Sequence, residues 1–164
     1  MAVKRTTADR HFSKCVRLRT NWHCEYCDKS FDHDRGSLHC SHYISRNYKI
    51  IRFNPYNALA HCFSCHEELG GGRWGGGNNA EFSYHYDNVH GPEIRESLRL
   101  MSKYAFPRFK RHEQDISVYY RDIAKEMEEM RMDGETDRIE FDMYQGCDEI
   151  TRLWDDLFNA VYQA

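Results

Sequence analysis

Four cysteines form two pairs with the spacing of a zinc site. Cys24 and Cys27 are separated by two residues, and so are Cys62 and Cys65. Two such pairs place four thiolates around one tetrahedral ion, with Zn–S distances of about 2.3 Å. In a reducing compartment, where disulfides are rare, this pattern favours zinc over two unrelated pairs of buried thiols. Because four thiolates leave no open coordination position, we expect the zinc to be structural.

His42, Asn57 and His66 lie at fixed intervals from these cysteine pairs. His42 comes 15 positions after Cys27, Asn57 comes 15 positions after His42, and His66 directly follows Cys65. A strand with His42 and a helix that begins at the second pair would face each other, so we expect His42 and His66 to share a small cleft. A neutral imidazole, with an ordinary pKa of about 6.5, accepts a proton from water near neutral pH. The alternative is an ordinary surface or hydrogen-bonding role, which we expect for most of the ten histidines.

The elements that would position these residues follow from the spacing of apolar residues and from the turn residues. The pattern predicts a helix over 8–20, strands over 38–44 and 50–53, and a helix over 62–69. It also predicts helices over 80–90, 92–105, 108–132 and 148–162. The fold class is therefore α+β. A basic arm and helix at 1–20 precede a zinc-stabilised core at 21–91, and a helical tail at 92–164 is acidic after about 112.

Charge is distributed unevenly along the 164 residues. The net charge is −3 overall, but it is +7 for 1–111 and −10 for 112–164, with histidine neutral. A basic segment suits nucleic acid and an acidic one repels it, although both could be ordinary solvated surface. No run of about 18 apolar residues is present, and residues 1–12 lack the apolar stretch of a signal peptide. We therefore expect a cytoplasmic protein with no membrane partner.

Several of these residues resemble the HNH nucleases, also called ββα-metal or His-Me finger nucleases. The closer resemblance is to the phage NinG/Rap-type recombination endonucleases, over about residues 9–105. The spacing of the cysteine pairs is also similar to that of phage endonuclease VII, a junction resolvase. The matching positions are His42-Tyr43, Ile51-Arg52-Phe53-Asn54, Asn57, Cys62-Phe63-Ser64-Cys65 and the segment 12–19.

The resemblance implies a zinc-pinned ββα-metal core and metal-dependent cleavage of DNA. His42 would be the general base, Asn57 would steady its loop or offer a carbonyl ligand, and His66 would bind a catalytic Mg²⁺ or Mn²⁺. Many HNH nucleases have an Asp ligand directly before the catalytic His, whereas this chain has Ser41, a poor ligand. Another ligand would have to come from His39, Glu67, Glu68 or a carboxylate of the tail. Imidazole ligands suit Mn²⁺, Ni²⁺ or Zn²⁺ better than Mg²⁺.

Basic residues near these positions are candidates for phosphate contacts, which supply affinity without reading sequence. Trp74, in a glycine-rich segment, could stack on an exposed base at a branch point. The candidates for DNA binding are Lys4, Arg5, Arg46, Lys49, Arg52, Arg73 and Trp74. Because a junction has two strands to cut, we also expect a symmetric homodimer.

The sequence thus favours a metal-dependent endonuclease that hydrolyses phosphodiester bonds in branched DNA. The expected substrates are Holliday junctions, D-loops and flaps, during phage recombination in the cytoplasm of a bacterial host. The alternative is a catalytically inactive, zinc-containing module that binds DNA or protein on the same scaffold. Ser41 favours the alternative, whereas the combination of His42, Asn57 and His66 favours the enzyme.

Overall fold

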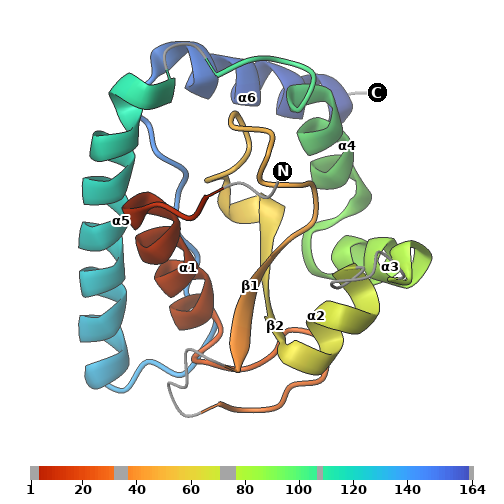
Figure 1. Cartoon of the computed structure of the whole chain (residues 1–164), viewed down its shortest axis with the longest axis vertical. Helices are drawn as coiled ribbons and strands as arrows, with labels where there is room; N and C mark the ends of the chain where they lie inside the picture. Colours follow the sequence, from red (N-terminus) through yellow and green to blue (C-terminus); the bar gives the residue numbers. More distant parts are fainter. Residues whose placement is uncertain (1–3, 32–36, 71–76, 107–108, 163–164) are drawn as a thin grey trace.

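A hairpin of two short antiparallel strands lies at the centre of the computed structural model (Figure 1). β1 (Leu38–His42) pairs with β2 (Ala58–Cys62), and α2 (Phe63–Gly70) follows β2 directly. A short 3-10 helix, η1 (Pro55–Asn57), leads into β2. The structure describes residues 4–31, 37–70, 77–106 and 109–162.

Helices cover both faces of the hairpin (Figure 1). On one side, α1 (Thr7–Arg19) packs along α5 (Phe109–Met132). On the other side, α3 (Asn79–His90) packs on α2, and α4 (Pro92–Met101) packs on α6 (Asp148–Tyr162). The described residues therefore form an α+β fold with six α-helices and one hairpin. None of these helices has the length and apolarity that crossing a membrane requires.

Each face of the hairpin belongs to a different hydrophobic cluster. Leu38, Ala58 and Ala60 pack with Phe12 of α1 and other residues of α1 and α5 in the first cluster. Leu59 packs with residues of α2, α3, α4 and α6 in the second cluster. Successive side chains of a strand point to opposite faces, so this division fixes the side of every residue in β1 and β2. Tail residues complete both clusters.

The predicted helices are confirmed, with most ends within one residue of those expected. The exception is α4, which ends at Met101. β1 is confirmed at its start and ends at His42. The strand predicted over 50–53 is wrong.

The segment 50–53 forms a turn because its apolar side chains pack in two different hydrophobic clusters. Ile51 lies in the second cluster and Phe53 in the first. Turn hydrogen bonds from Ile51 N–H to the Tyr48 carbonyl, and from Asn54 N–H to the Ile51 carbonyl, replace strand pairing. A run of apolar residues is therefore no evidence for a strand when its members serve opposite sides of a hairpin.

Arg52 lies inside the protein, so the prediction that it contacts DNA is not supported by its position. Its side chain is 3% exposed and pairs with the Asp9 carboxylate at 2.5 Å. It also donates to the Lys4 carbonyl at 3.1 Å. Burial alone would raise the pKa of Asp9, but hydrogen bonds from Arg52 and Thr6 and the charge of Arg52 hold it below its ordinary value. Arg52 thus joins the loop after β1 to the first turn of α1.

We expect Arg52→Ala to destabilise the protein strongly, because it leaves the Asp9 carboxylate buried without its partner. Breaking a buried ion pair costs about 3–5 kcal/mol. Urea unfolding followed by circular dichroism measures the change. The matched control is Arg99→Ala, since Arg99 pairs with Glu96 on the surface, where a pair is worth about 1 kcal/mol or less. Equal effects of the two substitutions would contradict a structural role for Arg52.

Candidate metal centre and active site

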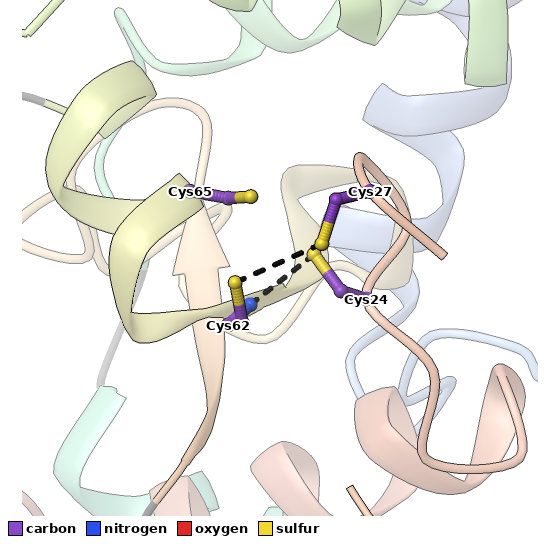
Figure 2. A group of neighbouring side chains, drawn as sticks. All are labelled: Cys24, Cys27, Cys62 and Cys65. Atoms are coloured by element: carbon purple, nitrogen blue, oxygen red, sulfur yellow. Dashed lines mark hydrogen bonds between the residues drawn. The ribbon is translucent and has the colours of Figure 1, made fainter. Parts of the chain in front are cut away.

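Four cysteine sulfurs meet where the loop after α1 crosses the end of the hairpin (Figure 2). Cys24 and Cys27 come from the loop, Cys62 ends β2 and Cys65 lies in the first turn of α2. All four sulfurs lie within 4.8 Å of one another, and all four cysteines are free.

The spacing of the sulfurs suits a tetrahedral ion. The sulfurs of Cys27 and Cys62 are 3.9 Å apart. Thiolates at about 2.3 Å from a tetrahedral zinc ion are separated by about 3.8 Å, whereas a disulfide needs about 2.05 Å. The Cys62 N–H also points at the Cys24 sulfur, at 3.3 Å. The cluster could therefore hold a structural Zn²⁺.

Glu25, inside the first cysteine pair, connects this cluster to the tail. Its buried carboxylate accepts hydrogen bonds from Arg19, from Arg138 and from the Ala60 N–H. Burial would raise the pKa of Glu25, but the charges of Arg19 and Arg138 lower it to about 2. The carboxylate is therefore ionised throughout the neutral range. It fixes the first cysteine pair against β2 from one side and against residue 138 from the other.

His42 is the last residue of β1 and lies on the face that packs against α1. Its Nε2 is 3.0 Å from the Arg52 carbonyl, and its ring is 6.1 Å from that of Phe12. A carbonyl only accepts, so Nε2 carries the proton and Nδ1 keeps its lone pair. Burial lowers the pKa of His42 to about 4. The ring is therefore neutral at pH 7, and Nδ1 is its unprotonated nitrogen.

Asn57 is fully buried and holds the connection between the two strands. Its amide nitrogen donates to the carbonyls of Ile44 and Ile51, at 2.9 and 3.1 Å. Its side-chain oxygen accepts from the Ile44 N–H at 2.8 Å, and its backbone carbonyl accepts from the Tyr43 N–H. Three of these bonds fix the two residues that follow His42, and the fourth holds Ile51. Asn57 is thus placed to position His42, since its amide hydrogens are already used.

His66 lies on the opposite face of the hairpin, next to Ser41. Its Nδ1 is 3.1 Å from the Ser41 hydroxyl, and its ring centre is 5.2 Å from that of His39. Burial lowers the pKa of His66, and electrostatic interaction with His39 and Arg5 lowers it further, against the opposing charge of Glu67. A neutral imidazole is the form that binds a metal ion.

The expected cleft between His42 and His66 is not what the structure shows. Successive side chains of a strand point to opposite faces of the hairpin. Ser41 therefore faces α2 and His66, whereas His42 faces α1. The two rings therefore lie on opposite sides of the hairpin, and no contact between them is present among the described residues. Sequence spacing identified the right elements but could not give the phase of the strand.

The DNA-binding candidates occupy different surroundings. Lys4 and Arg5 are exposed before α1, and Arg5 is close enough to His66 to affect its pKa. Arg46 is half-buried, and Lys49 is exposed over the ring of Phe109 at 5.3 Å. Arg73 and Trp74 lie outside the described residues.

A second histidine pair was not anticipated from the sequence. His61 is fully buried in β2, and its ring lies 5.4 Å from that of His85 in α3. Neither ring nitrogen of His61 has a hydrogen-bond partner among the described residues. His61 lies on the side of α2 and α3 because it pairs with His39 across the hairpin. This register cannot be read from the sequence, so no signal in the sequence points to the pair of His61 and His85.

Comparison with protein-family models, curated proteins and solved structures gives no match for this chain. The resemblance to HNH nucleases therefore stays a prediction from the sequence.

We expect the purified protein to carry about one zinc ion per chain, because the four sulfurs match one tetrahedral site. Cys65→Ser should lose most of this zinc and melt at a lower temperature, since structural zinc can supply about 10–16 kcal/mol of apparent binding energy. Mass spectrometry of the metal content measures the first effect and circular dichroism the second. Cys147→Ala is the control, because Cys147 is buried in the second cluster, apart from the four cysteines. A wild-type chain without zinc after growth in zinc-sufficient medium would contradict the assignment.

We expect the His42 imidazole to titrate near pH 4, because burial favours its neutral form. The unfolded chain has an ordinary histidine pKa of about 6.5, so it takes up the proton first as the pH falls. The contribution of His42 to stability is thus complete above about pH 6.5 and is lost on acidification towards pH 4. Proton NMR of the ring measures the pKa, with His42→Gln to assign the signal. A midpoint near pH 6.5 would show that the ring is not buried as described.

Proposed function

We propose that this protein is a metal-dependent DNA endonuclease of the ββα-metal type that hydrolyses phosphodiester bonds in branched DNA. The observation that carries the proposal is the unit formed by β1, β2 and α2. It has a neutral histidine at the end of the first strand and a second histidine on the helix. The four-cysteine cluster joins the same helix to the loop after α1.

In this proposal His42 acts as the general base. Nε2 donates to the Arg52 carbonyl, so Nδ1 is the nitrogen that takes a proton from water. The water oxygen attacks the scissile phosphorus and the bond to the 3′ oxygen breaks. Asn57 acts as a positioning residue, because it holds the backbone directly after His42. A divalent ion bound through His66 would polarise the phosphoryl oxygen and stabilise the leaving oxygen.

In this proposal the scissile phosphate binds at the end of β1. Ser41 and His42 are consecutive residues, about 3.8 Å apart along the backbone, and His66 contacts Ser41. A phosphate that lies across the strand end would therefore have His42 on one side and His66 on the other. Arg5 and Lys4 are exposed nearby and would contact the flanking phosphates.

A catalytically inactive DNA- or protein-binding module is the second candidate. Ser41 in place of an acidic ligand favours it, and so does the position of His42 and His66 on opposite faces of the hairpin. The two candidates differ in one property, which is turnover. Phage recombination, branched substrates and action as a homodimer are further parts of the proposal, and they follow from the sequence resemblance.

The test is cleavage of labelled four-way junctions, flaps and linear duplex with Mn²⁺ or Mg²⁺. We expect branch-selective cutting, and His42→Ala should slow it by about 10²–10⁴-fold, which is the usual contribution of a general base. His11→Ala is a matched control. His11 is also half-buried and also bonds one ring nitrogen to a backbone carbonyl, that of Ser117 at 2.8 Å.

The control separates chemistry from folding. If both variants cut as slowly as each other, the loss reflects stability and His42 is not the base. If the wild-type chain binds junctions tightly and cuts none of them, the inactive module replaces the enzyme.

A further inference from the structure

Two histidines, His39 of β1 and His66 of α2, lie close together between the strand and the helix. His39 and Ser41 are alternate residues of β1, so their side chains lie on the same face. His66 of α2 lies over this face, with its ring centre 5.2 Å from that of His39 and its Nδ1 3.1 Å from the Ser41 hydroxyl. Both imidazoles are partly exposed to solvent.

We infer that His39 and His66 together bind a transition-metal dication, and that Ser41 positions His66 for this task without binding the metal. The inference rests on the proposed function for its biological meaning, because it names the missing ligand and the class of metal at the same site.

The distance between the rings suits two ligands of one ion. Two imidazoles bound to a tetrahedral ion at about 2.0–2.1 Å have their ring centres about 5 Å apart. His61 and His85 have a similar spacing, 5.4 Å, so distance alone is not decisive. Exposure distinguishes the pairs, since an ion held by two histidines needs water molecules to complete its coordination. His61 is 0% exposed, whereas His39 and His66 can be reached by solvent.

The Ser41 hydroxyl holds Nδ1 of His66 at 3.1 Å, which leaves Nε2 as the nitrogen without this contact. A histidine that binds a metal through one nitrogen usually donates its other N–H to a neighbouring acceptor, which fixes the ring. A hydroxyl can accept as well as donate, and in the metal-bound form we infer that Nδ1–H donates to the Ser41 hydroxyl while Nε2 of His66 binds the ion. A serine at this position thus orients the ligand on the helix, and His39 provides the second ligand from the strand.

The ligand types predict which metal is bound. Imidazole suits Fe²⁺, Ni²⁺, Cu²⁺ and Zn²⁺ best, and Mn²⁺ accepts it more readily than Mg²⁺, which prefers oxygen ligands. Among the described residues, no carboxylate lies close enough to His39 and His66 to act as a third ligand of the same ion. We therefore expect Mn²⁺ to bind more tightly than Mg²⁺.

The test is titration of the zinc-loaded, full-length chain with Mn²⁺, without DNA. Electron paramagnetic resonance measures free Mn²⁺, and NMR shows which histidine signals the bound ion broadens. We expect broadening of the His39 and His66 rings in the wild-type chain. His39→Ala and His66→Ala should each weaken Mn²⁺ binding by about tenfold or more, and Ser41→Ala by about tenfold. His85→Ala is the control and should leave the affinity unchanged.

Two results would overturn the inference. One is unchanged Mn²⁺ affinity in His39→Ala, and the other is broadening in the wild-type chain that does not include both rings. The broadening map needs no variant, so it decides the matter even if His39→Ala fails to fold. Cleavage assays distinguish this failure from failure of the proposed function. Metal binding without cutting would support the metal site and contradict the proposed endonuclease activity. Metal-dependent cutting that is insensitive to His39→Ala would support the endonuclease and contradict the metal site.

Discussion

The four-cysteine cluster of Cys24, Cys27, Cys62 and Cys65 is the constraint on which the rest of the structure depends. It joins a loop that follows α1 to the point where β2 becomes α2. The hairpin has only two strands, and such a hairpin is marginally stable alone in water. A tetrahedral ion at its end would fix the angle between strand and helix more rigidly than side-chain packing could. The positions of His39, Ser41 and His66 all follow from that angle.

Charged residues connect the four-cysteine cluster to the helical tail. Glu25 lies between two of the cysteines and bonds to Arg19 and Arg138. Arg131 donates to the carbonyls of Leu18 and Arg19, which end α1. The acidic tail is thus attached by arginines to the end of α1 and to Glu25, beside the four-cysteine cluster. Its role in the fold is structural, whatever further partner its surface has.

The sequence predicted the elements better than it predicted their relative orientation. Cysteine spacing and helix periodicity depend on neighbours within a few positions, so they can be read locally. The phase of β1 depends on its pairing with β2, in which His42 lies opposite Ala58 and Leu38 lies opposite Cys62, partners that are distant in sequence. That is why His42 and His66 were expected in one cleft and lie on opposite faces. Arg52 was misjudged for a similar reason, because its partner Asp9 lies 43 positions away.

The packing of α1 against α5 has a consequence for how the chain is made. The apolar side of α1, with Phe12, Cys15 and Val16, is covered by residues of α5 such as Ile116 and Tyr120. Hydrogen bonds between the two segments join residues 113 positions apart. High contact order slows folding, because loop closure must precede the contacts that reward it. During synthesis α1 therefore leaves the ribosome long before α5, and its apolar face lacks this cover until about a hundred further residues have followed.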